Sequence, residues 1–187
     1  MIFSLKRTVT FTPPARHRRD LTDKTWANRF FQLDTLTNLA GTYQVVGRVE
    51  EANRILRDVY SGRLKLHGKE DRDSLKAAGN YATTLGNLKR YDEVKSLLRK
   101  PMRVARRVLG EGCSTTLTMK AIYAYALYTD PSATLDDLRE SVTTLEDVER
   151  TARRVLGSAH PLTTGIEDGL RNARAALAAR ETPSANS

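Results

Sequence analysis

The feature that most constrains this chain is a repeat of about 42 residues, in which the same side chains recur at equivalent positions. Residues 33–68 laid over residues 75–110 match identical side chains at Leu33/Leu75, Asn38/Asn80, Ala40/Ala82, Arg48/Arg90, Glu51/Glu93, Leu56/Leu98, Arg57/Arg99 and Gly68/Gly110. A further shift matches Leu75/Leu117, Tyr81/Tyr123, Ala82/Ala124 and Leu85/Leu127. Repeats of this length form stacked helical hairpins. The sequence therefore predicts an all-α, right-handed α-solenoid, a fold that usually works by offering a surface.

Length and composition agree with one short repeat array in a reducing compartment. The 187 residues contain one cysteine, Cys113, so no disulfide can form within the chain. No apolar run approaches the ~18 residues that a membrane span needs, and residues 1–5 are too short for the apolar part of a signal peptide. We therefore expect a cytoplasmic protein without a membrane partner.

The positive charge is concentrated at the N-terminus. The net charge is +9, and residues 1–19 contribute +5 of it because they hold five basic side chains and no acid. Residues 1–23 also contain Pro13 and Pro14, which oppose helix formation, so we expect a disordered basic arm. The alternatives are an arm that contacts nucleic acid or an acidic surface, and an organelle transit peptide.

The spacing of apolar residues predicts three hairpins and a final helix. The expected helices run from about 22 to 46, 49 to 66, 74 to 88, 91 to 109, 115 to 128, 135 to 156 and 162 to 180. Gly47, Gly68, Gly110 and Gly157 mark helix ends. The predicted domain spans residues 24–180, with units at about 24–68, 69–110 and 111–157, a cap helix at 161–180 and a flexible tail at 181–187.

The third unit is longer than the others because of an insertion at residues 129–134. Asp130, Pro131 and Ser132 are typical of a turn, and Thr134 with Asp137 predicts a capping box for the next helix. The insertion is therefore expected in the loop between two helices of one hairpin, where an array tolerates extra residues.

The order of short motifs in residues 24–170 resembles tetratricopeptide repeats of the 42-residue kinesin light chain type. The motifs are Asn38-Leu39-Ala40, Gly47-Arg48-Val49, Glu51-Ala52, Asp73-Ser74-Leu75, Asn80-Tyr81-Ala82, Arg90-Tyr91, Glu93-Val94, Arg106-Arg107-Val108-Leu109-Gly110, Arg153-Arg154-Val155-Leu156-Gly157 and His160-Pro161. In such an array, Ala40, Ala82 and Ala124 let the helices of a hairpin approach closely. Larger side chains fill the space between hairpins; here they are Leu39, Tyr81, Tyr123, Leu56, Leu98 and Leu145.

One departure from the pattern is Pro101, which takes the packed position of Val59 and Val148. A proline inside a helix costs about 3 kcal/mol, because it removes a backbone hydrogen bond and clashes with the preceding turn. We expect the helix to bend or break near Lys100.

The resemblance implies a peptide bound on the concave face, which the first helix of each pair forms. The residues expected to line it are Thr37, Asn38, Gly41, Gln44, Lys76, Asn80, Thr83, Asn87, Lys120, Tyr125 and Tyr128. A side-chain amide can donate to and accept from a peptide backbone at once, which suits Asn38 and Asn80 to this task. The alternative is that these two asparagines only stabilise their hairpins.

Two other groups of residues have competing interpretations. The basic stretch Arg99, Lys100, Arg103, Arg106 and Arg107 is expected to be a solvated convex face, or a contact for phosphate or an acidic partner. The aromatic residues Trp26, Phe30 and Phe31 are expected to cap the first hairpin, or to join another subunit or a preceding repeat.

Catalytic and metal-binding patterns find little support. Cys113 and His160 fall at unit boundaries, and His17, His67 and His160 lack the spacing of metal ligands. Gly110-Glu111-Gly112 is a helix stop rather than a phosphate loop. We therefore expect a non-catalytic scaffold or adaptor without a cofactor, which binds a protein or peptide. The alternative is a basic repeat protein that contacts nucleic acid through the arm and the Arg99–Arg107 helix.

Overall fold

The computed structural model describes residues 24–182, with side-chain positions from Phe31 onward. This part of the chain is helical, and no strand occurs in it. The helices are α1 (Lys24–Val45), α2 (Val49–His67), α3 (Arg72–Asn87), α4 (Tyr91–Leu109), α5 (Ser114–Thr129), α6 (Leu135–Leu156) and α7 (Pro161–Glu181). The predicted arm at residues 1–23 and most of the predicted tail, residues 183–187, lie outside the described residues.

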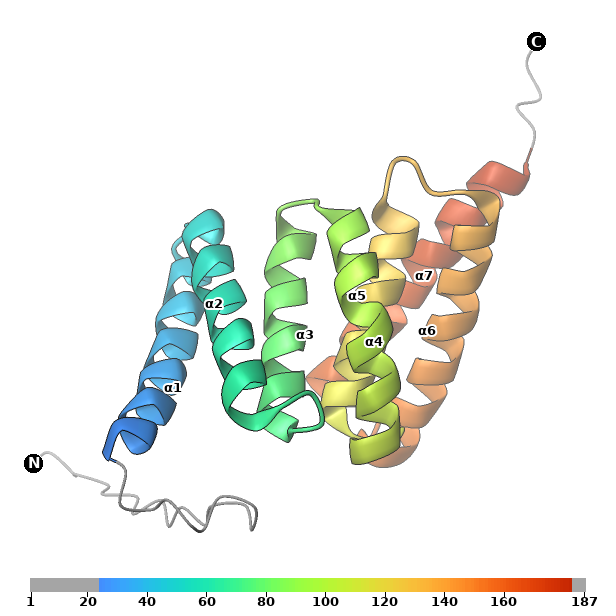
Figure 1. Cartoon of the computed structure of the whole chain (residues 1–187). Coiled ribbons are helices and arrows are strands. Elements are labelled where there is room, and N and C mark those ends of the chain that lie inside the picture. The colour runs from blue at the N-terminus through green and yellow to red at the C-terminus, as the bar shows by residue number, and fades with distance from the viewer. Residues whose placement is uncertain (1–23, 183–187) are drawn as a thin grey trace, which may run out of the picture.

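The helices form three antiparallel hairpins that stand side by side in chain order (Figure 1). The second helix of each hairpin packs against the first helix of the next, so α2 contacts α3 and α4 contacts α5. Among the first helices, α3 contacts α5 and α5 contacts α7. The final helix, α7, covers α6. The predicted all-α helical repeat is therefore confirmed.

Glycines in the left-handed region end the helices where the sequence predicted. Gly68, Gly110 and Gly157 follow α2, α4 and α6 with φ of 82°, 89° and 88°. Gly47 lies in the α1–α2 turn with φ 80°. The matching position of the second hairpin holds Lys89, which adopts φ 59° without the freedom of a glycine.

Small and large residues of the core pack largely as predicted. Ala40, Ala82 and Ala124 are fully buried, and Leu56, Leu98 and Leu145 are at most 2% exposed. Leu39 is different, because 39% of it is exposed. Its counterpart Tyr81 lies against Tyr60 of the preceding hairpin, with ring centroids 6.5 Å apart. No hairpin in the described range precedes α1, so Leu39 does not fill the space between two hairpins and that prediction is wrong.

Helix α4 continues through Pro101, from Tyr91 to Leu109. The expected break near Lys100 is therefore wrong, while a bend stays a prediction. Pro101 is buried, and α4 is held between α3 and α5. Burial of the surrounding apolar side chains outweighs the loss of one backbone hydrogen bond, because each such side chain contributes about 1.5–3 kcal/mol.

We predict that Lys89→Gly stabilises the protein. A left-handed conformation costs an L-residue about 1–2 kcal/mol, part of which is offset by the extra freedom of glycine in the unfolded chain. The free energy of unfolding in guanidinium chloride should rise by about 0.5–1 kcal/mol. Gly47→Lys is the matched control at the equivalent turn and should lower it. Equal or reduced stability of Lys89→Gly would contradict this account of the turn.

Candidate binding groove

Three hollows follow one another along the face made by α1, α3, α5 and α7. The first, of about 300 Å³, lies between α1 and α3 and is lined by polar side chains with Arg63 of α2. The second, of about 180 Å³, lies further along the same two helices. The third, of about 460 Å³, lies between α3, α5 and α7. Neighbouring hollows share lining residues, because Thr37 and Asn80 border the first two and Thr83 borders the second and third. This row of adjoining hollows is called the groove below.

Most of the residues predicted for the concave face line these hollows. They are Thr37, Asn38, Gly41, Gln44, Lys76, Asn80, Thr83, Asn87, Tyr125 and Tyr128. Lys120 lines none of the three. Its ammonium group donates to Glu111 at 2.8 Å and to Asp147 of α6 at 3.0 Å. It takes the position of the fully buried Ala78 in α3, so its side chain is held by α6 rather than offered to a ligand in the groove.

Asn38 and Asn80 keep their side-chain amides available. Asn38 is exposed and Asn80 half-buried, and both border the polar hollow. Within residues 31–182, the side-chain hydrogen bonds of α1 and α3 involve threonines, Asp34, Ser74 and Asp71, but not these two amides. The alternative that they tie their hairpins together therefore has no hydrogen bond to support it.

A buried arginine that sequence reasoning missed forms the base of the polar hollow. The side chain of Arg63 is 6% exposed, and it pairs with Asp34 of α1 at 2.5 Å and with Asp73 of α3 at 3.5 Å. A buried charge is tolerated only where it is paired, because desolvation costs several kcal/mol. The equivalent positions of the next two hairpins hold the fully buried alanines Ala105 and Ala152. The sequence signal that could have revealed the role of Arg63 was a charged residue at a position where the other two units have alanine.

The other end of the groove is apolar. Tyr125 and Tyr128 of α5 meet edge to face, with ring centroids 5.4 Å apart. Burial raises the pKa of the Tyr128 phenol, and a hydrogen bond with Asn172 of α7 opposes this effect. Leu162 and Ile166 of α7 line the same hollow as these rings. The groove therefore changes from amide and charged groups at α1–α3 to apolar groups at α5–α7.

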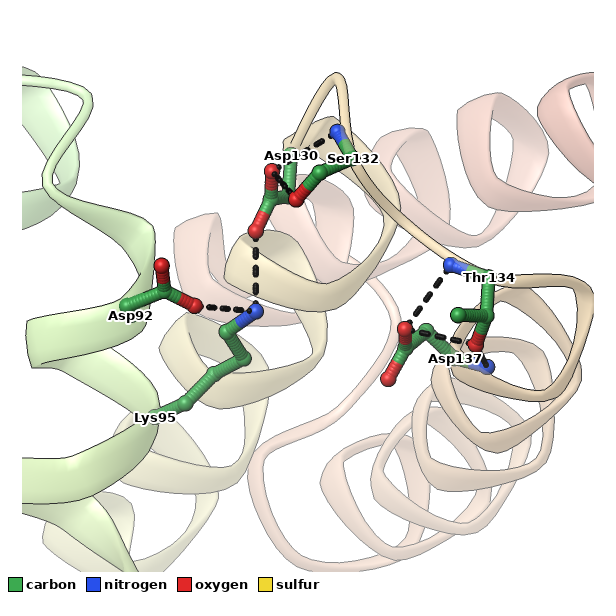
Figure 2. A network of polar contacts seen from close by, with 6 residues as sticks. All are labelled: Asp92, Lys95, Asp130, Ser132, Thr134 and Asp137. Atoms are coloured by element: carbon green, nitrogen blue, oxygen red, sulfur yellow. Dashed lines mark hydrogen bonds and ion pairs between the residues drawn. The ribbon is translucent and has the colours of Figure 1, made fainter.

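A polar network fixes the end of α5, the helix that carries both tyrosines. Asp130 follows α5 directly, and its side chain is 8% exposed. It accepts from Lys95 of α4 at 2.8 Å and from the backbone amide and hydroxyl of Ser132 at 2.9 and 2.7 Å (Figure 2). Asp92 accepts from the same Lys95 ammonium at 2.8 Å. The inserted loop is thereby tied to the preceding hairpin.

The predicted capping box at the start of α6 is confirmed. The Thr134 hydroxyl accepts from the backbone amide of Asp137 at 3.1 Å, and the Asp137 carboxylate accepts from the backbone amide of Thr134 at 2.8 Å (Figure 2). The Thr134 hydroxyl also donates to the Asp137 carboxylate at 2.7 Å, and this bond, together with the one from the Thr134 backbone amide, lowers the pKa of Asp137. The insertion lies between the two helices of the third hairpin, as its turn chemistry indicated.

Cys113 and His160 occupy the same position in successive units, which is the residue before a first helix. Asp71 holds that position before α3, where its carboxylate accepts from the amide of Ser74 at 2.9 Å. His160 caps α7 through Nδ1, which accepts from the amide of Leu162 at 3.1 Å. The geometry therefore gives His160 a helix-capping role.

Among the residues with described positions, no cluster of histidine, cysteine and acidic side chains could hold a metal ion. Over the same residues, no helix is long and apolar enough to cross a membrane.

Comparison with known proteins agrees with the resemblance to tetratricopeptide repeats. The family model of a tetratricopeptide repeat matches residues 32–73, a stretch as long as one period of the repeat. The fold is similar to the nearly identical TPR-like repeats of a kinesin light chain-like protein from Podosopora anserina. The TM-score is 0.69 at 23% identity, over 79% of this chain and 67% of that one.

A second solved structure, BtubC (BKLC) from P. vanneervenii, is similar with a TM-score of 0.53 at 12% identity, over 85% of this chain and 68% of that one. No curated protein matches the sequence. The chain thus carries a tetratricopeptide repeat and folds as kinesin light chain-like repeats do.

The Lys95–Asp130 contact should make stability depend on pH in the acid range. Hydrogen bonds from Lys95 and Ser132 lower the pKa of Asp130 from 3.8 to about 2. A lowered pKa means that the stabilisation is present above the unfolded value and is lost as the pH falls through the folded one. The stability difference between wild type and Asp130→Asn should therefore shrink by about 2 kcal/mol between pH 5 and pH 2.

Urea unfolding at a series of pH values measures this difference. Asp92→Asn is the control, because its carboxylate contacts the same lysine but is 88% exposed, so its effect should be small. A difference between wild type and Asp130→Asn that does not change with pH would show that the contact is not an ion pair in solution.

Proposed function

We propose that this protein is a non-catalytic interaction scaffold that holds an extended segment of a partner protein in the groove of α1, α3, α5 and α7. The observation that carries the proposal is the row of adjoining hollows along the first helices, lined at one end by the Asn38 and Asn80 amides, which make no hydrogen bond within residues 31–182. Repeats of this kind form protein-interaction scaffolds, which agrees with the family match to residues 32–73.

The chemistry of the polar end suits a peptide backbone. An extended strand of protein offers alternating amide and carbonyl groups, and the Asn38 and Asn80 side chains can bond to both kinds of group. Each such hydrogen bond contributes about 0.5–1.5 kcal/mol net. Lys76 and the Asp34–Arg63–Asp73 group border the same hollow, so a ligand there meets charges of both signs. We therefore expect the polar end of the groove to bind peptides of many different sequences.

The nucleic-acid alternative has weaker support. Arg99, Lys100, Arg103, Arg106 and Arg107 are exposed on α4, as predicted. However, Arg107 pairs with Glu70 at 2.5 Å and Arg106 with Glu111 at 3.5 Å, which reduces the positive charge available to phosphate groups. The basic arm that the alternative also needs lies outside the described residues.

We predict that Asn38→Ala combined with Asn80→Ala lowers partner capture by about tenfold or more, because two hydrogen bonds to the ligand are lost. The full chain would be immobilised and exposed to nuclease-treated cell lysate at moderate salt. Retained proteins would be quantified by mass spectrometry, and circular dichroism would check that the variant remains folded.

The matched control is Lys100→Ala combined with Arg103→Ala, two exposed changes on the second helix of the same hairpin that contributes Asn80. This control should retain the same partners as wild type. Capture that survives the asparagine changes but not the α4 changes would refute groove binding. Retention of nucleic acid, without nuclease and only at low salt, would favour the alternative.

A further inference from the structure

We propose that the α5–α7 end of the groove is a pocket for a bulky apolar side chain of the bound segment, with a neutral or cationic residue rather than an acidic one beside it. This inference rests on the proposed function and names the chemistry of the ligand that the groove selects. The pocket is the third hollow, of about 460 Å³, between α3, α5 and α7. Its volume is large enough to admit a tryptophan, phenylalanine or leucine side chain.

The walls of the pocket are apolar and firmly held. Leu145 of α6 and Ile166 of α7, each 2% exposed, lie at its base within the core cluster of the third hairpin. Ile122 of α5 and Leu162 of α7 line its sides. Because these residues belong to the packed core or border it, the pocket exists before a ligand arrives. A preformed apolar pocket binds a side chain with little ordering cost.

Two glycines on opposite walls keep the pocket open. Gly86 of α3 is buried, yet a Cβ added there would meet no atom within 4 Å. Gly165 on α7 is exposed, and a Cβ added there would likewise meet no atom within 4 Å. The first and third units show what Gly86 replaces, because the equivalent positions hold Gln44 and Tyr128. Gly86 lies in the last turn of α3, and its missing side chain leaves space that a glutamine or tyrosine takes up in the other units.

Tyr125 and Tyr128 favour an apolar or aromatic side chain of the ligand. Tyr125 is 44% exposed, although its ring packs edge to face against Tyr128. Tyrosine presents a large rigid surface to a ligand at low entropy cost, and a further ring could pack against this pair in an edge-to-face or offset arrangement. A cationic group of the ligand beside that side chain would also be attracted to the faces of the tyrosine rings.

The charge at the rim of the pocket also favours a neutral or cationic residue beside the bound apolar side chain. Asp168 of α7 is the charged residue that lines the pocket, and the other polar groups at the rim are neutral, such as Asn87 and Asn172. Arg171 contacts Asp168 at 2.7 Å, but both side chains are more than half exposed, so this pair is weak and exchangeable. We call the apolar side chain that enters the pocket the anchor. A ligand carboxylate next to the anchor would be repelled by Asp168, whereas a ligand cation would be attracted to it.

A phage-displayed library of random linear peptides, panned on the immobilised full chain, tests the proposal. We expect the enriched peptides to share one bulky apolar residue and to lack acidic residues next to it. A selected peptide would then be labelled, and its affinity measured by fluorescence anisotropy. Gly165→Leu should weaken binding by at least about tenfold by filling the pocket, and Gly86→Ala should weaken it from the opposite wall. Neither added Cβ would meet an atom within 4 Å, and circular dichroism would check that both variants remain folded.

Gly79→Ala is the matched control, because it is a buried glycine of α3 outside the pocket whose added Cβ would make an ordinary contact with Met119 at 3.8 Å. It should leave the affinity within about twofold of wild type. For peptides with a cation beside the anchor, Asp168→Asn should weaken binding by about two- to fivefold.

The outcomes separate this inference from the proposed function. Peptides that lose affinity on the Asn38→Ala and Asn80→Ala changes but not on Gly165→Leu would overturn the pocket while leaving groove binding intact. Enriched peptides without a shared apolar residue, or no enriched peptides at all, would also overturn it. Peptides insensitive to both the asparagine and the glycine changes would overturn both proposals.

Discussion

Each hairpin of this protein depends on its neighbour for the burial of its apolar side chains. Leu98 of α4 is fully buried only because α3 and α5 lie on either side of that helix, and Leu145 is covered by α7 in the same way. A single hairpin leaves one face of each helix in water, so stability must come from stacking. The contacts between hairpins therefore decide both the shape of the groove and where it ends.

Polar contacts between hairpins are placed as regularly as the apolar ones. In α2, the buried Asn53 donates to Thr84 of α3 at 2.8 Å. One period later, Lys95 of α4 donates to Asp130 at the end of α5. Both residues reach forward to the next unit from the same position of the repeat. Because a buried polar group is costly unless its partner is in place, these contacts set the register between hairpins more strictly than apolar packing alone.

The irregular features of the array concern its two ends and the inserted loop. Arg63 replaces an alanine of the repeat and pairs with acids on α1 and α3, so the first hairpin is joined to the second by charge. The insertion after α5 replaces a tight turn with the Asp130 network. As a consequence, the groove has a charged and amide-rich end beside Arg63 and an apolar end beside the tyrosines of α5.

The sequence by itself determined the features that depend on neighbouring residues. The helix ends at Gly68, Gly110 and Gly157, and the capping box of Thr134 and Asp137, follow from local backbone chemistry, and the structure has them where they were predicted. The repeat also fixed which residues share a face, so ten of the eleven positions assigned to the concave face line the groove. Only the tertiary structure decided the rest. The pairing of Lys120 with α6, the unbroken α4 at Pro101, the exposure of Leu39 and the pocket beside Gly86 depend on what the neighbouring helix supplies. Packing between units is non-local, and a periodic pattern carries no information about the space that a missing side chain leaves.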